Sequence, residues 1–132
     1  MHAAINSDEN LTNILWKYNA DANIRDKEMK SALVHALEQD YENLTIIENL
    51  ALFTDLKLEG PNCMNLLQIA IKLGHLKSLV KLLEKGAPVD QISKNTGIFW
   101  KIFDLLSFFG NFLLYFKYFL KLPKSFFIEK FF

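Results

Sequence analysis

The chain has 132 residues, which is enough for one domain, and 51% of them are hydrophobic, which is ample for a core. Its formal net charge of zero excludes a global attraction to nucleic acid or to anionic membranes. The single cysteine, Cys63, excludes an intramolecular disulfide, fits a reducing compartment and is expected in or near the core. Residues 1–10 are polar and lack a positive region and an apolar run, so no secretory signal is expected.

The first predicted helix begins near Ser7, which can cap it, and Asp8 and Glu9 suit the positive end of the helix dipole. Apolar residues then recur at helical spacing and are expected to share one face: Leu11, Ile14, Leu15 and Tyr18. The segment is interpreted as the second helix of a truncated first unit. A polar turn over residues 19–30 follows it.

A pair of helices is predicted next, over residues 31–39 and 41–53. His35 lies in the first of them and is expected to be packed or hydrogen-bonded rather than to act as a ligand. The unusual segment 50–61 predicts a long second helix, and Gly60-Pro61 then breaks the chain, after which Asn62 can cap the next helix. The expected apolar faces consist of Leu33, Ala36 and Leu37 in the first helix and of Leu44, Ile47, Leu50 and Ala51 in the second.

A further pair is predicted within residues 65–97. Gly74 can take a positive φ and end its first helix, Gly86 can end the second, and Pro88 then forbids more helix. Ala70 is small where the two helices would cross most closely. The expected apolar faces are Leu66, Leu67, Ile69, Ala70 and Leu73, then Leu76, Leu79, Val80, Leu82 and Leu83.

The two complete pairs are copies of one pattern. Ser31-Ala32-Leu33 and Asn65-Leu66-Leu67 open equivalent helices 34 positions apart (65 minus 31), and residues 19–23 parallel residues 86–90. With these motifs, residues 7–97 resemble a short, degenerate or truncated array of ankyrin repeats, whose period is about 33 residues. The array departs from the family pattern where the usual proline is Ala32 or Leu66, and where Asp40-Tyr41 replaces the Gly-His turn.

The resemblance implies an all-α, ankyrin-like helical repeat solenoid with a partial repeat at 7–30 and repeats at 31–64 and 65–97. It also implies a non-enzymatic module that binds another protein through hairpin fingers and the exposed side of the inner helices. The residues expected to contact the partner are Asn23, Arg25, Asp26, Lys27, Val34, Glu38, Gln68, Lys72, Asp90, Gln91, Ser93 and Lys94. A solvated loop without a binding role is the competing interpretation of residues 19–30.

No catalytic residue, cofactor site or metal site is predicted. His2, His35 and His75 are far apart in sequence, and the chain has no His-Cys or His-carboxylate ligand spacing and no glycine-rich phosphate loop. Cys63 has no accompanying His-Asn or His-Asp pattern that would make it a nucleophile. His75 matches the family's Gly-His turn, which implies a structural role through local hydrogen bonds.

Residues 98–132 differ abruptly in composition, because eleven of the chain's twelve Phe lie there. Three interpretations remain open. The segment can be an apolar helical cap, with helices over 98–109 and 112–121 covering the last repeat. It can be a membrane or membrane-surface helix over residues 102–120, which would make the protein a membrane-anchored adaptor rather than a cytoplasmic one. It can also be the product of a frameshift that truncated a longer ankyrin array.

Overall fold

The computed structural model describes residues 1–88, which hold the compact unit Met1–Ala87. Within this range the protein is all-α: an isolated bridge joins Arg25 to Ser31, and residues 1–88 contain no strand. The elements in chain order are α1 (His2–Ile5), α2 (Glu9–Lys17), α3 (Ala32–Leu37), α4 (Leu44–Phe53), the short 3-10 turn η1 (Pro61–Cys63), α5 (Leu66–Leu73) and α6 (Leu76–Glu84).

Predictions that concern the chain beyond Pro88 lie outside the described residues. These are the boundary after residue 97, the helices over 98–109 and 112–121, and the membrane helix over 102–120. None of the helices within residues 1–88 has the length and apolar character needed to cross a membrane.

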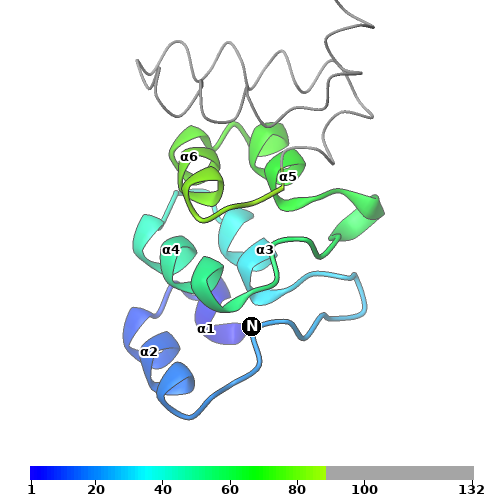
Figure 1. Ribbon diagram of the computed structural model, residues 1–132. Coiled ribbons are helices and arrows are strands. Elements are labelled where there is room, and N and C mark those ends of the chain that lie inside the picture. Colours follow the sequence, from blue (N-terminus) through cyan, green and yellow to red (C-terminus); the bar gives the residue numbers. More distant parts are fainter. Residues whose placement is uncertain (89–132) are drawn as a thin grey trace, which may run out of the picture. The chain divides into compact units, whose positions relative to one another are not determined.

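The helices are arranged in two rows (Figure 1). Each helix contacts its partner in the pair, so that α1 lies against α2, α3 against α4 and α5 against α6. One row places α3 between α1 and α5, and the other places α4 between α2 and α6. The loops that lead into α3 and α5 project on the same side of the structure, beyond the row of α1, α3 and α5 (Figure 1).

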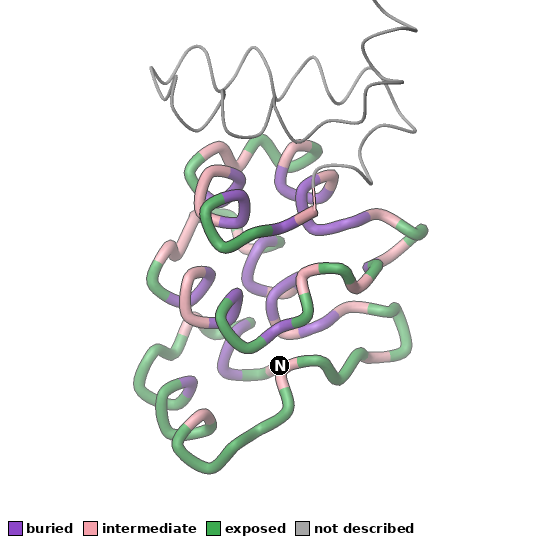
Figure 2. The backbone as a smooth tube through the Cα atoms, viewed as in Figure 1, coloured by how far each residue is buried: buried purple, intermediate pink, exposed green. Residues whose placement is uncertain are grey.

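The core lies where the rows and the pairs face one another (Figure 2). Its largest fully buried side chains include Leu33, Leu37, Ile47, Leu67 and Leu82. The predicted apolar faces of α3 and α4 are confirmed, except that Leu44 is only partly buried. On α5 the prediction is wrong for Leu73, which is 39% exposed because it belongs to the last turn before the chain leaves the helix at Gly74.

Local sequence sets the helix ends. Ser31 and Asn65 both occupy the N-cap position, and Asn65 forms a capping box with Gln68. Gly74 adopts the left-handed conformation with φ 74°, as predicted, and Gly86 likewise has φ 92°. The starts of α3 and α5 and the ends of α5 and α6 therefore lie where the sequence provides polar caps and glycines.

Three predicted helix ends are wrong. Asp8 rather than Ser7 caps α2, because its side chain accepts the Leu11 N–H. Helix α4 begins only at Leu44 and ends at Phe53, since the Asn43 side chain caps its start. Asn62 caps no helix: it has a positive φ of 56° within η1, and the cap of α5 is Asn65.

The first unit is also different from the one predicted. It is a complete pair, because residues 2–5 form the short helix α1, whose Ala3 and Ala4 are buried. The predicted apolar face of α2 is mostly solvent-exposed (Figure 2), with Ile14 at 53% and Tyr18 at 77%. Helix α2 instead turns Thr12 inward and packs Trp16 on Phe53, with ring centroids 5.1 Å apart. Cys63, expected in or near the core, is exposed.

Polar contacts join neighbouring pairs across the second row. One Glu42 carboxylate oxygen, in the loop before α4, accepts both the backbone N–H and the hydroxyl of Ser78, each at 2.7 Å. Lys81 of α6 lies 2.6 Å from the Glu48 carboxylate of α4, which lowers the pKa of Glu48. The Ser78 side chain is fully buried, so the Glu42–Ser78 contact is part of the interior of the helix stack, whereas the Lys81–Glu48 pair is partly exposed.

Candidate protein-binding surface

The loop before α3 forms a short hairpin over residues 25–31, here called the finger. The Asp26 N–H donates to the Lys30 carbonyl and the Met29 N–H to the Asp26 carbonyl, both at 3.0 Å. The Asp26 carboxylate accepts the N–H groups of Glu28 at 2.8 Å and Lys30 at 3.0 Å. One side chain thus organises the whole turn, as an Asx-type turn does.

The finger is fixed to α3 by the same carboxylate. Asp26 Oδ2 lies 2.7 Å from His35 Nε2, and both side chains are largely shielded from water. The Lys30 N–H, then the His35 ring and the Glu28 N–H, hold the pKa of Asp26 below its usual value against the opposing effect of burial. The prediction that His35 is packed or hydrogen-bonded is confirmed. Asp26 was predicted to contact a partner, but its carboxylate is occupied inside the finger.

The pH dependence of stability should reveal this role of Asp26. Because its folded pKa lies below the usual 3.8, the carboxylate stabilises the fold above that pH, and its contribution is lost as pH falls through the folded pKa. Asp26→Asn should therefore be less stable than wild type from about pH 7 down to about pH 5, with a difference that narrows in more acidic solution. Urea melts monitored by circular dichroism from about pH 7 to about pH 3 measure this difference.

The control for this prediction is Asp40→Asn, since Asp40 is exposed and forms no hydrogen bond or ion pair with another described residue. Its melts should follow wild type at every pH. A difference between Asp26→Asn and wild type that stays constant down to the lowest pH would contradict the role assigned to the Asp26 charge.

Asn23 and Arg25 connect this segment to the next loop of the chain. Asn23 Oδ1 accepts the Asp55 N–H at 2.6 Å, and Arg25 Nη1 donates to the Glu59 carbonyl at 3.3 Å. The two loops that project on one side of the rows are therefore linked to each other (Figure 1). Both side chains remain exposed, but each already forms a hydrogen bond within the molecule.

A groove of about 290 Å³ lies between the finger, α3, η1 and α5. Lys30 lies 2.9 Å from the carboxylates of both Glu28 and Glu38, and this pairing raises the pKa of Lys30. Apolar and charged side chains are therefore mixed in one concave surface. The residues that line the groove are Glu28, Lys30, Glu38, Pro61, Asn62, Met64, Ile69, Lys72 and Leu73.

The groove contains two of the predicted contact residues, Glu38 and Lys72. Two others are positioned differently: Val34 is 2% exposed and belongs to the core, and the Gln68 side chain accepts the Asn65 N–H in the capping box of α5. Val34 belongs to the apolar run Ala32–Val34, and its burial leaves no side-chain surface for a partner. Lys27 is exposed on the finger. The remaining residues, Asp90, Gln91, Ser93 and Lys94, lie outside the described range.

Sequence reasoning missed Lys30, Met64 and Leu73 as groove residues. Lys30 had a usable signal, because Glu28 and Glu38 flank it at distances in sequence that a hairpin followed by a short helix brings together. No signal in the sequence indicated that Met64 and Leu73 line the groove, because their exposure depends on where η1 and α5 end.

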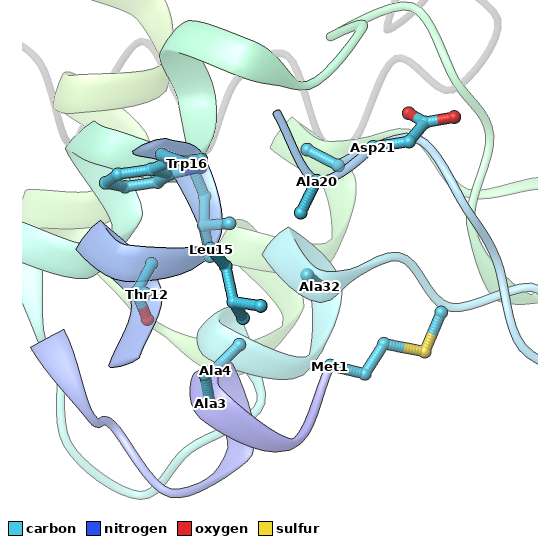
Figure 3. A pocket seen from close by; sticks show the side chains of 11 residues that line it. Met1, Ala3, Ala4, Thr12, Leu15, Trp16, Ala20, Asp21 and Ala32 are labelled. Atoms are coloured by element: carbon cyan, nitrogen blue, oxygen red, sulfur yellow. The ribbon is translucent and has the colours of Figure 1, made fainter. Parts of the chain in front are cut away.

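A second recess, of about 60 Å³, lies between α1, α2 and the start of α3 (Figure 3). Its wall includes the small residues Ala3, Ala4, Ala20 and Ala32 (Figure 3). Thr12 donates its hydroxyl hydrogen bond to the Asp8 carbonyl. Small-molecule sites are several times larger and present converging polar groups, so this recess is a packing gap between small side chains.

The described part of the chain has no cluster of side chains suited to a metal site. Within residues 1–88 no three His, Cys, Asp or Glu side chains are grouped so that they could hold a metal ion. The expectation that His75 makes local hydrogen bonds is wrong for its Nδ1 atom, which is buried without a hydrogen-bond partner among the described residues. His75 occupies the N-cap position of α6, where the Glu42 carboxylate satisfies the Ser78 N–H instead.

Comparisons with protein families and with curated proteins identified no relative of this chain. The chain matches no protein-family model, and it matches no curated protein.

Proposed function

We propose that this protein is a non-enzymatic protein-binding module of the ankyrin-repeat type, built as a helical repeat solenoid. The repeat pattern of the sequence supports this assignment. So does the relation between the helix pairs, because α3–α4 contacts α5–α6 through the same two rows by which α1–α2 contacts α3–α4. A unit of two short helices buries its apolar faces only by layering on neighbours of the same kind.

The groove between the finger and α5 is the proposed binding surface. Its mixture of apolar and charged side chains is the main observation that supports the proposal. Met64 and Leu73 supply apolar contact area there, while Glu38 and Lys72 supply charges that remain near water. Protein interfaces combine an apolar centre with a polar rim in this manner. The finger that forms one side is held by the Asp26 hydrogen bonds, so its ordering cost is not incurred on binding.

Variants of the groove test the proposal. Full-length protein on a solid support is incubated with extract from the cells that produce it, and the bound proteins are quantified by mass spectrometry. The double variant Lys72→Glu/Leu73→Asp should lose specific partners by about tenfold or more, because it reverses one charge and places another on the apolar surface. Both positions are exposed, so the fold should remain intact.

Lys77→Glu is the matched control, since Lys77 is exposed on α6 and does not line the groove. It should retain the partners that the groove variant loses. Identical sets of proteins bound by wild type, the groove variant and the control would refute the placement of the binding surface.

A further inference from the structure

The groove carries charges of both signs on different elements. Lys30 lies 2.9 Å from Glu28 on the finger and 2.9 Å from Glu38 at the end of α3. One cation between two carboxylates leaves a formal charge of −1, and the Glu28 side chain is still 70% exposed. This part of the groove therefore favours a cationic group of a partner.

Lys72 gives the other part of the groove the opposite sign. It lies on the last turn of α5, is exposed, and forms no ion pair with another residue of the described range. Because no carboxylate within residues 1–88 lies at ion-pair distance from it, its charge favours a carboxylate of a partner. The −1 and +1 charges sum to zero, and the groove is consequently dipolar rather than acidic or basic.

The surface that these charges share is partly apolar. Ile69 is 4% exposed and forms part of the core, Met64 is partly buried, and Leu73 is 39% exposed. The volume of about 290 Å³ lies at the lower limit of the ~300–1,000 Å³ of small-molecule sites. A groove of this size has room for one apolar side chain of a peptide, while the peptide side chains next to it can reach the exposed charges of Lys72 and Glu28 from outside the groove.

We propose that the groove binds a short extended segment of a partner protein in which an apolar side chain stands between a carboxylate and a basic side chain. The carboxylate pairs with Lys72, the basic group with the Glu28–Glu38 cluster, and the apolar side chain contacts Met64 and Leu73. Exposed ion pairs contribute little free energy, so they set the order and direction of the segment, while the apolar contact supplies most of the affinity. The inference rests on the proposed function.

Selection from a phage-displayed library of short random peptides tests the inference. The full-length protein and its Lys72→Glu variant are used as separate baits, with the intact fold of each verified by circular dichroism. Wild type should enrich peptides with an apolar residue flanked by one acidic and one basic residue. Lys72→Glu should enrich peptides with a basic residue in place of the acidic one. A peptide selected on wild type should bind the variant about fivefold more weakly in titration calorimetry.

Leu73→Ser separates the failure of this inference from that of the proposed function. Peptides that bind wild type and Lys72→Glu equally but lose affinity for Leu73→Ser would overturn the charge pattern and retain the groove as a binding surface. Peptides that bind all three proteins equally would overturn both proposals. A library that yields no enriched sequence on wild type would overturn the peptide inference, while the groove would still be tested by the proteins captured from extract.

Discussion

Leu67→Ala should lower the free energy of unfolding by about 2–5 kcal/mol, whereas Leu73→Ala on the same helix should lower it by only about 1 kcal/mol. Leu67 is 1% exposed on the first turn of α5, and Leu73 is 39% exposed on its last turn. The cost of truncating Leu67 has two parts, the lost transfer of its methyl groups out of water and the cavity that remains. Leu73 loses only partial burial, and no enclosed cavity follows.

Comparing the two variants is informative because Leu67 and Leu73 were both predicted to lie on the apolar face of α5. A helical stripe read from the sequence alone gives them equal weight, and only the structure distinguishes them. Urea melts of full-length wild type and both variants, followed by circular dichroism at the same protein concentration, measure the difference. Equal destabilisation by the two variants would show that Leu73 is covered by protein in solution, and the groove next to it would then be closed.

The central pairs were predictable from sequence because their local signals agree with one another. Asn65 and Gln68 give the start of α5, the apolar spacing gives its buried face, and Gly74 gives its end. Each signal needs only neighbouring residues to act. The same agreement of cap and period identifies α3, which begins after Ser31.

The first pair was less predictable because its burial depends on distant residues. Helix α1 has only four residues, and it is held by the contact of Ala3 and Ala4 with α3, which no local pattern reveals. Tyr18 and Ile14 follow the helical period, yet they are exposed because the described helices that contact α2 lie on the side of Thr12 and Trp16. Periodicity identifies an apolar face but does not identify what covers it.

The candidate site was predictable only as a region. Glu38 and Lys72 were selected because they lie on the polar side of two inner helices, and both line the groove. The polar interactions within the finger were not predictable from sequence. Asp26 was expected to face a partner, but its carboxylate instead accepts hydrogen bonds from backbone N–H groups and contacts His35. Side chains that can satisfy their own backbone compete with any role in binding, and sequence does not show which use prevails.

The contact between Glu42 and Ser78 should be the strongest polar coupling between two helix pairs of the described unit. Glu42→Ala leaves the Ser78 N–H and hydroxyl without their shared acceptor in a buried place, and it should cost about 1–3 kcal/mol. Ser78→Ala removes the hydroxyl but keeps the N–H bond to Glu42, so its cost should be smaller. The sum of the two single effects should exceed the effect of the double variant by about 0.5 kcal/mol or more.

Urea melts of the four proteins of this cycle provide the measurement, with Glu59→Ala as the control for loss of a loop carboxylate. The Glu59 side chain forms no ion pair or hydrogen bond with a described residue, because its contact with Arg25 uses the backbone carbonyl. Its removal should change stability by less than about 0.5 kcal/mol. Additive effects of Glu42→Ala and Ser78→Ala would contradict the contact. Coupling would establish in solution that the loop before α4 caps the next pair, a link which neither segment reveals in its own sequence.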